Sequence, residues 1–512
     1  MIRRTSASVV AFFLLIGPAW PNTRDALVVC DDVKEPLTLS PLEEFSEKNH
    51  TLVQQIFDGL VRFDPEGRII PALATEWKRI DPLTVRFKLR AGVRFHNGET
   101  FNAESVRYTI DRYLDPKSGF PALGYVSTIE RAVVVDDLTV DLKTRMPDGL
   151  LLNRLGGFIV MIPPRHCEKE GIESLRRAPV GTGAFRFESW DNDKEIVLRR
   201  NPDYWREGYP LVSEVRFRFV PRERQIQALL DGVVGLVTEL PGTATLRVAK
   251  DPGTRVLKQK TYYTVGATFN TSRPPLSDRR VRLALNLGMN KKDLIRYDLL
   301  GNGLPLASMS VPGETGHDPR LVQYPYAPGE ARRLLNDAGV VVPLKLKALV
   351  LLQAERTARI IAKQLQDIGV VLKIRAGSDR EILPELRTGE WDLAIGGIPD
   401  PMAHSFFIQS ILLYSGSPYS LMKDPDYDKR FEAMMTTLDP DEHARKAREL
   451  DRYVHENVLS LFTYQRIRTY GLRKNLEYTP YVTGMPYFME AAFRQEGAAP
   501  RSRAGGGPGE GK

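Results

Sequence analysis

Cysteine is scarce in this chain, and the spacings that mark catalytic or metal-binding chemistry are missing. Two cysteines, Cys30 and Cys167, occur among 512 residues. Because they lie far apart in the sequence, we favour two buried thiols, with a single disulfide bond as the alternative. The sequence contains no C-x-x-C, no H-E-x-x-H and no G-x-S-x-G motif. An enzyme therefore has little positive support.

Neither sign of charge dominates. Lysine and arginine number 72 against 64 acidic residues, so the formal net charge is +8. The basic residues are scattered among the acidic ones, and no basic stripe with interleaved aromatic side chains occurs. We therefore expect no nucleic acid as a partner. The composition is ordinary for a soluble globular protein, with 42% hydrophobic and 27% charged residues.

A long apolar run occurs only at the N-terminus. Arg3 and Arg4 precede the apolar residues 7–16, and Gly17-Pro18-Ala19 offers small residues for cleavage. A run of this length is short for a transmembrane helix and typical of a signal peptide. We predict that residues 1–25 are a signal peptide and that the mature protein is soluble and exported to the periplasm.

The chain is longer than one compact core usually requires, so we expect two lobes, with three as the alternative. Between residues 328 and 395, strand and helix patterns alternate, which indicates a mixed or parallel α/β sheet. In that region the pattern predicts helices at 328–338 and 354–368 and strands at 344–350, 370–374 and 392–395. Elsewhere it predicts strands at 26–30 and 84–89, helices at 52–61 and 103–114, and a hairpin at 132–142. The Gly-rich tail at 497–512 is predicted to be disordered.

Residues 179–205 (PVGTGAFRFESWDNDKEIVLRRNPDYW) form the most informative segment. Gly181 and Gly183 mark its entry, and two apolar runs flank a turn at Asp191-Asn192-Asp193. This predicts a β-hairpin followed by a second turn at Asn201-Pro202-Asp203. Gly181-Thr182-Gly183 lacks the third glycine, the lysine and the helix of a phosphate-binding loop, so a turn is the better interpretation.

Several blocks together resemble the family 5 solute-binding proteins of bacterial ABC importers, the dipeptide- and oligopeptide-binding type. The blocks follow one another in family order along nearly the whole mature chain. They are IPALATEW at 70–77, FKLRAGVRFHNG at 87–98, FNAESV at 101–106, the 179–205 hairpin, FNT at 269–271, PLSD at 275–278, VRLAL at 281–285, YAP at 326–328, QLQDIG at 364–369 and Asp400-Pro401. Each block is a weak pattern, but the ordered set predicts the fold.

The resemblance implies an α/β protein with the two-lobed periplasmic-binding-protein fold of type II, carrying an extra subdomain in the first lobe. Ligand would bind in the cleft between the lobes, which close around it by a hinge motion. The expected first lobe is 26–266 plus 475–496, with the extra subdomain at 46–165. The expected second lobe is 267–474, and the crossings would lie near 263–269 and 468–475.

The resemblance also points to candidate ligand-binding residues. Peptide-binding members place an aspartate after a Gly-Trp pair, whereas this chain reads GGIPDP from Gly396 through Ile398 to Pro401. Asp400 is the acid available there, and it either binds the ligand amine or belongs to a structural turn. Because a buried charge needs a partner, the ligand carboxylate would also need a cation. Arg356 is the nearest arginine to the corresponding family loop, although it falls in a predicted helix.

Two further positions are candidates by the same resemblance. Ser46 and Glu47 match a first-lobe loop that meets the ligand backbone in the family; the alternative is an ordinary loop before a helix. His404 follows Asp400 closely enough to reach the cleft. No second histidine lies at ligand spacing, so we expect no metal site and no cofactor.

These observations predict the substrate-binding component of an ABC importer. It would capture a peptide or peptide-like solute and, as a monomer, deliver it to a permease in the inner membrane. Two alternatives stay open: the same fold binding a sugar, an opine or a nickel chelate, and a secreted hydrolase, for which no catalytic constellation is visible.

Overall fold

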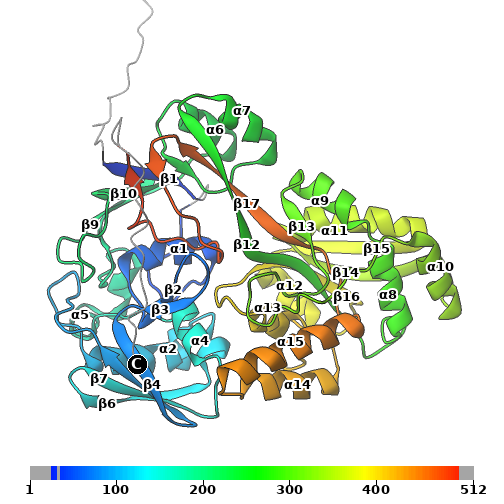
Figure 1. The fold of residues 1–512 in the computed structure, drawn as a ribbon, viewed down its shortest axis with the longest axis horizontal. Helices are drawn as coiled ribbons and strands as arrows, with labels where there is room; N and C mark the ends of the chain where they lie inside the picture. The colour runs from blue at the N-terminus through cyan, green and yellow to red at the C-terminus, as the bar shows by residue number, and fades with distance from the viewer. Residues whose placement is uncertain (1–24, 32–34, 495–512) are drawn as a thin grey trace, which may run out of the picture.

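The structure is a computed structural model that describes residues 25–31 and 35–494. Two strands, β12 (Thr254–Phe269) and β17 (Tyr464–Arg473), cross between two lobes. Figure 1 shows them linking a first lobe, which holds β1 (Ala26–Cys30), to a second lobe, which holds β14 (Leu344–Leu351). The predicted disordered tail and all but the last residue of the predicted signal peptide lie outside the described residues.

One mixed sheet runs through both lobes. Its strand order is β15-β14-β16-β12-β17-β11-β1-β10-β9-β8, and β13 pairs with β17. β12 serves both lobes, because residues 254–260 pair with β17 and residues 263–269 pair with β16. The other strands of this sheet are β8 (Phe185–Asp191), β9 (Glu195–Arg200), β10 (Glu214–Arg218), β11 (Leu236–Val237), β13 (Gly303–Pro305), β15 (Val370–Gly377) and β16 (Leu393–Pro399). The backbone hydrogen bonds between β12 and β17 therefore connect the two lobes through one continuous sheet.

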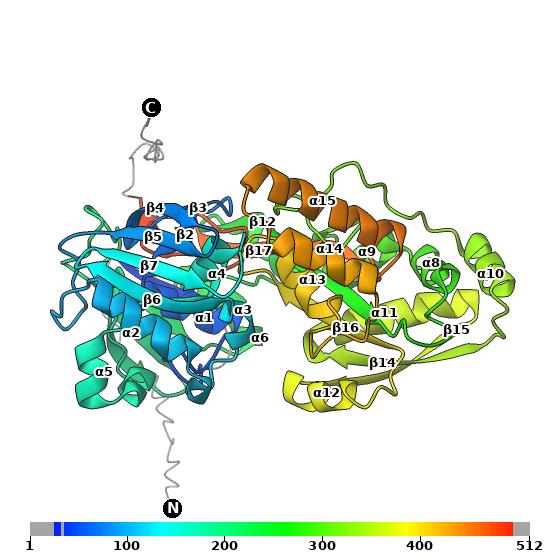
Figure 2. The same ribbon diagram turned by 90° about the horizontal axis from the view of Figure 1, so that it is seen from below.

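The second lobe is an α/β layer structure, as the sequence predicted. β14 pairs in parallel with both β15 and β16. The helix α11 (Glu355–Leu365) packs on β15 and buries Ala358, Ile361 and Leu365, which recur at helical spacing. Figure 2 shows the remaining helices of this lobe around the same sheet. The expected α/β class is thereby confirmed.

The first lobe carries a second sheet with the order β4-β5-β7-β6. Its strands are β4 (Ala74–Asp81), β5 (Thr84–Leu89), β6 (Ile129–Asp136) and β7 (Thr139–Thr144). The helix α2 (Ala103–Leu114) packs on β6, and a capping box between Asn102 and Ser105 fixes its start. β5 and α2 have the boundaries that alternation and helical spacing predicted.

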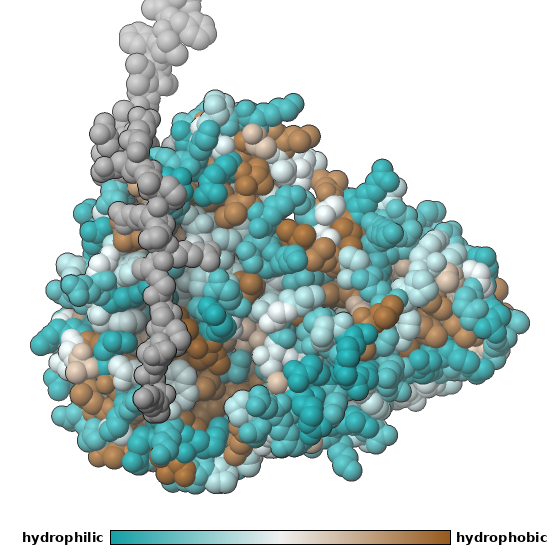
Figure 3. Space-filling view, viewed as in Figure 1, coloured by the Kyte–Doolittle hydropathy of each residue, from teal (hydrophilic) through white to brown (hydrophobic). Residues whose placement is uncertain are grey.

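The remaining helices are distributed over both lobes. They are α1 (Glu47–Ile56), α3 (Leu123–Val126), α4 (Leu151–Phe158), α5 (Pro164–Glu170), α6 (Arg222–Leu230), α7 (Thr245–Lys250), α8 (Arg279–Leu287), α9 (Lys291–Leu299), α10 (Pro328–Asp337), α12 (Asp379–Leu386), α13 (Phe406–Leu412), α14 (Pro425–Met435) and α15 (Pro440–Glu456). Among the described residues, none of these helices has the length and hydropathy needed to cross a membrane. Hydrophilic residues dominate the face in Figure 3, with hydrophobic residues in scattered patches. Cys30 and Cys167 are buried free thiols.

The first helix begins and ends earlier than predicted. The sequence suggested a helix at 52–61, whereas α1 spans Glu47–Ile56 and residues 61–63 form the strand β2 (Val61–Phe63), which pairs with β3 (Ile69–Pro71). Ser46 caps the helix by accepting the N–H of Asn49 through its hydroxyl. At the other end, a Cβ on Gly59 would come within 2.8 Å of the Ile159 carbonyl. The helix ends at Ile56, and the residues that follow it include Gly59, which packs closely against the Ile159 backbone.

The hairpin of residues 179–205 holds the end of α1. Gly183 donates its N–H to the carbonyl of Ile56, and a Cβ on Gly181 would lie 2.1 Å from the same oxygen. Both glycines are therefore required by close backbone packing. The buried Asp58 carboxylate then accepts hydrogen bonds from Thr182, Tyr204 and Trp205. This family-like segment is an anchor of the first lobe.

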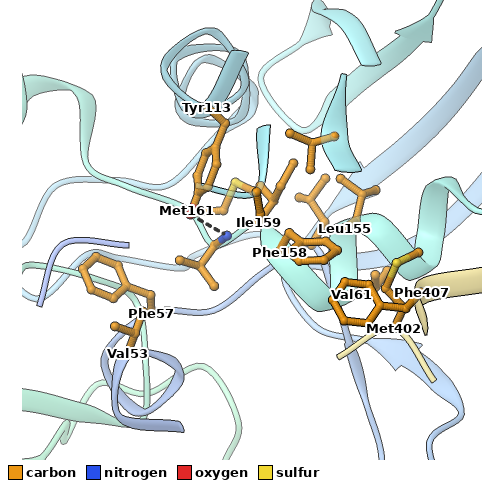
Figure 4. Packing of buried hydrophobic residues seen from close by; sticks show 14 of the residues in the cluster. Val53, Phe57, Val61, Tyr113, Leu155, Phe158, Ile159, Met161, Met402 and Phe407 are labelled. Atoms are coloured by element: carbon orange, nitrogen blue, oxygen red, sulfur yellow. Dashed lines mark hydrogen bonds between the residues drawn. The ribbon is translucent and has the colours of Figure 1, made fainter. Parts of the chain in front are cut away.

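The two lobes pack directly against each other on the side away from the crossing strands. Figure 4 shows Met402 and Phe407 of the second lobe beside Leu155 and Phe158 of α4. The Asn153 side chain donates to the carbonyl of Met402 at 2.8 Å, which ties α4 to the second lobe. These contacts belong to one hydrophobic cluster with members from both lobes. The arrangement is therefore a closed one, and the interlobe seam runs from these contacts to the crossing strands.

Candidate functional site

A cluster of charged residues lies where α1 meets the crossing strand β17. Glu47 and Lys48 come from the first turn of α1, and Arg466 and Arg468 come from β17. The arginines are two residues apart on a strand, so both side chains leave the same face. Asp31, which follows β1, and Glu239, which follows β11, complete the cluster. Ion pairs of 4 Å or less connect all six residues.

Glu239 is the centre of this cluster. Its carboxylate lies 3.5 Å from Arg466, 3.6 Å from Arg468 and 3.8 Å from Lys48. Burial opposes its ionisation, but Lys48, Arg466 and Arg468 outweigh burial and hold its pKa well below the ordinary value. Glu239 therefore stays ionised, and the crossing region carries fixed charges of both signs.

The two arginines differ in exposure and in the hydrogen bonds that they make, although the buried Nε of Arg468 has no partner among the described residues. The Arg468 side chain is 3% exposed, pairs with Glu47 and donates to the carbonyl of Gly484. The Arg466 side chain is 28% exposed, and its guanidinium lies 5.3 Å from the centre of the Tyr263 ring. Among the described residues, none accepts a hydrogen bond from the Arg466 guanidinium. Arg468 thus links β17 to Glu47 and to the Gly484 backbone, whereas the guanidinium N–H groups of Arg466 are available to a further acceptor.

Tyr263 connects this cluster to the second lobe. It lies on β12, opposite Pro399 of β16. A Cβ on Gly397 would lie 2.2 Å from the Tyr263 hydroxyl oxygen, so that hydroxyl occupies the space where a side chain would stand. This explains Gly397, which stands at the position where peptide-binding relatives were expected to carry the tryptophan of Gly-Trp.

Aromatic side chains from both lobes line the seam further from the crossing. Tyr125 stacks on Phe158 of the first lobe with ring centres 5.2 Å apart, and it lies 5.0 Å from Phe407 of the second lobe. Phe45, from the loop before α1, lies 4.8 Å from Phe158. The seam therefore combines an apolar aromatic part with a charged part, the combination that small-molecule sites commonly use.

Asp400 lies at the seam, but its carboxylate already has partners within the chain. It is 3% exposed, and its two oxygens accept the N–H groups of Met402 and His404, both at 2.7 Å. Burial raises its pKa to about 7, and the buried Glu314 next to it also has a raised pKa. These contacts fit the structural-turn alternative, and a role in binding an amine stays a prediction.

His404 is buried and pairs with a histidine that the sequence did not suggest. Its Nε2 lies 2.8 Å from Nε2 of His443, a residue of α15. His404 Nδ1 accepts the N–H of Phe406, so His404 must donate through Nε2 to His443. His443 can then donate through Nδ1 to the carbonyl of Thr437. In the part of the chain that the structure describes, no three His, Cys, Asp or Glu side chains gather in a way that could hold a metal.

The other predicted site residues are placed differently. Ser46 is exposed and caps α1, Glu47 pairs with Arg468, and Ile398 is half-buried in β16 opposite Thr264. These three lie around the crossing strands. Arg356 is exposed on α11, where it donates to the carbonyl of Tyr297 and pairs with Asp298. The structure thus groups Ser46, Glu47 and Ile398 near the charged cluster but directs Arg356 to α9.

Sequence reasoning missed Glu239, Arg466 and Arg468. One signal was available for the arginines, because Arg-x-Arg in a strand places two cations on one face. Glu239 carried no such signal, since its partners are more than 190 positions away along the chain. Only the fold brings these charges together.

Comparison with known proteins identifies the family. Residues 68–418 match the family described as bacterial extracellular solute-binding proteins, family 5 Middle. Among curated proteins, the chain is 28% identical over 336 residues to the glutathione-binding protein GsiB of Pectobacterium atrosepticum, covering 65% of this chain and 64% of that protein. It is 27% identical over 444 residues to di/tripeptide-binding protein 2 of Pseudomonas aeruginosa, covering 79% and 82%. The first of these alignments spans less than two thirds of the relative's length.

Solved structures show the same fold. The periplasmic binding protein DppA of Helicobacter pylori, in complex with the peptide STSA, superposes with a TM-score of 0.78 at 22% identity, covering 92% of this chain and 98% of that one. AgaA of A. tumefaciens R10, in complex with agropinic acid, gives a TM-score of 0.78 at 23% identity, covering 92% and 99%. The fold is therefore that of periplasmic binding proteins, and the chain belongs to the bacterial extracellular solute-binding proteins of family 5.

Proposed function

We propose that this chain is the solute-binding component of an ABC importer and that its solute is a peptide or peptide-like compound. The observation that carries the proposal is the interlobe seam, where a charged cluster at the crossing strands adjoins an aromatic part built by both lobes. Charged groups can pair with the terminal ammonium and carboxylate of a peptide, and aromatic rings can pack against its side chains. The curated relatives named for glutathione and for di- and tripeptides support the same class.

The mechanism we propose is reversible binding with lobe closure. The β12–β17 ladder serves as the hinge, and the contacts of Asn153 and Phe407 across the seam form in the closed state. Ligand stabilises the closed form only by contacting it better than the open form. The closed protein then delivers the solute to a membrane permease.

The compartment, oligomeric state and lobe boundaries are part of the proposal. Residues 1–25 would direct export to the periplasm, and the mature chain would act as a monomer. The first lobe would comprise 26–266 and 475–496, and the second 267–474. At the site, Ser46, Glu47 and Ile398 would contact the ligand backbone. Asp400 is retained as the candidate for the ligand amine, Arg356 as a candidate for its carboxylate, and His404 as a residue of the cleft.

A thermal-shift screen tests the solute class. The purified mature chain would be heated with dipeptides, tripeptides, glutathione, opines, sugars and nickel chelates in separate wells. A ligand that binds only the native state at 100 times its Kd adds about 2.7 kcal/mol of stability, so true ligands raise Tm clearly. We expect the peptides or glutathione to do so. A shift with opines, sugars or nickel chelates alone would replace the peptide assignment, and catalytic turnover of the peptides would contradict a binding role.

A further inference from the structure

Arg466 has a fixed backbone at the crossing of the two lobes. Its position in β17 is paired with Gly303 of β13, and its carbonyl accepts the hydroxyl of Thr261 from β12 at 3.0 Å. Glu239 of the first lobe lies on one side of its guanidinium, and Tyr263 lies on another. Because the Tyr263 hydroxyl abuts Gly397, only one tyrosine ring separates Arg466 from β16 of the second lobe. The guanidinium is thus placed between the lobes.

The donors of Arg466 are available to a ligand. A guanidinium carries five N–H donors, and a planar carboxylate can accept two of them side by side. Within the described chain, Arg466 has an ion pair at 3.5 Å and a cation–π contact but donates no hydrogen bond from its side chain. Arg468, two residues away, is nearly fully buried and already donates to Glu47 and Gly484. Arg468 also has an unpartnered Nε, but that atom is buried, so Arg466 is the more accessible donor of the pair.

The charges around Arg466 favour a solute that carries both signs. The ion-paired residues are three cations, Lys48, Arg466 and Arg468, and three acids, Asp31, Glu47 and Glu239, whose formal charges cancel; Arg222 is a further cation that lowers the pKa of Glu239. A solute with one carboxylate and one ammonium preserves this balance, whereas a bare anion would add a negative charge beside Glu239. Burying an unbalanced charge is costly. A zwitterion therefore leaves the charge of the ion-paired residues unchanged, and its carboxylate can pair with their cations.

We propose that the Arg466 guanidinium, in cation–π contact with Tyr263 and paired with Glu239, binds the free carboxylate of a zwitterionic solute in the interlobe seam. This inference rests on the proposed function, because it names the group that the same site recognises. It assigns carboxylate recognition to the second crossing strand rather than to the loop before α11, where Arg356 was expected. A terminal amide in place of the carboxylate would lose the charge-assisted hydrogen bonds to Arg466.

A capture experiment with paired ligands tests the assignment. The mature chain would be mixed with an equimolar library of dipeptides and tripeptides, each present as the free acid and as the C-terminal amide. Native mass spectrometry would give the ratio of acid to amide among the captured peptides. We expect at least about a tenfold excess of free acids with the unsubstituted chain and a ratio near one with Arg466→Gln, whose capture of amides should not change.

Two further variants make the outcome decisive. Lys260→Gln removes one exposed positive charge from the neighbouring strand β12, so it should keep the acid-to-amide ratio of the unsubstituted chain. Arg466→Lys keeps the charge but not the planar donor pair, so its ratio should be intermediate, which also guards against a folding defect in Arg466→Gln. If the unsubstituted chain captures no peptide, the proposed function fails. If it captures peptides but shows no preference for acids, or if Arg466→Gln retains the preference, the Arg466 assignment is overturned while the proposed function stands.

Discussion

The Nε2 atoms of His404 and His443 lie 2.8 Å apart beside the interlobe seam. The Nδ1 atom of each ring is hydrogen-bonded to the backbone, that of His404 to the Phe406 N–H and that of His443 to the Thr437 carbonyl. The chain of hydrogen bonds from His443 to Phe406 works only when both rings are neutral. Burial, together with His443 and Arg154, lowers the pKa of His404 well below its ordinary value, and burial lowers that of His443. Asp148 of the first lobe and Lys446 of α15 also act on the pKa of His443, in opposite directions.

The lowered pKa values of His404 and His443 predict that the free energy of unfolding decreases in acid. The unfolded chain binds protons on both histidines below their ordinary pKa of 6.5, whereas the native protein does not, so stability falls as pH drops below that value. Asp400 acts in the opposite direction, because its native pKa of about 7 lies above the ordinary 3.8 and favours the native state in acid.

Comparing variants separates the two effects. Urea unfolding would be measured for the unsubstituted chain and for His443→Gln from about pH 7.5 to about pH 5. We expect the unsubstituted chain to lose stability relative to the variant as pH falls. Parallel pH profiles would show that His443 does not remain neutral in the native protein.

Gly181→Ala should destabilise the first lobe. The added methyl group would collide with the Ile56 carbonyl, a backbone atom that cannot rotate away. Overpacking of this kind costs about 1–3 kcal/mol in the free energy of unfolding. The control is Gly124→Ala in α3, where no atom lies within 4 Å of the new methyl group, and it should be neutral or slightly stabilising. Equal effects from both substitutions would contradict the packing role of the hairpin entry.

Asp58→Asn should weaken the junction of α1 and the hairpin. An asparagine offers one acceptor oxygen in place of two, so one of the donors from Thr182, Tyr204 and Trp205 loses its partner. A buried unpaired donor costs about 1–3 kcal/mol. Asp203→Asn in the exposed turn of the same hairpin is the matched control and should change stability by less than about 0.5 kcal/mol. Urea unfolding of both variants measures the difference.

Asp400→Ala distinguishes the two roles proposed for that residue. If Asp400 binds the ligand amine, calorimetry should show that binding of free-amine peptides is abolished, with N-acetylated peptides as the comparison. If it only holds the turn, the N–H groups of Met402 and His404 lose their acceptor and Tm falls without a change in the preference for free amines. Glu390→Ala, an exposed acid of the same lobe, should alter neither property.

Much of the local structure could be predicted from the sequence. Alternation along residues 84–89 and helical spacing along 103–114 located β5 and α2, because these patterns depend on neighbours in the chain. The first helix was misplaced because Gly59, which lies within the predicted segment, packs closely on the backbone of the distant Ile159, a contact that helix propensity does not reveal. The ordered family blocks predicted the α/β fold and the family.

The candidate site could not be derived in the same way. Arg466 lies within ion-pair distance of Glu239 and in cation–π contact with Tyr263, although these residues are more than 200 positions away in the sequence. His443 was overlooked because 39 positions separate it from His404. Apart from the first helix, the sequence by itself determined the elements that it predicted, the α/β class and the family, since periodicity and ordered motifs are local information. Only the tertiary structure decided which charges meet at the crossing strands, because electrostatic partners are chosen by distance in space.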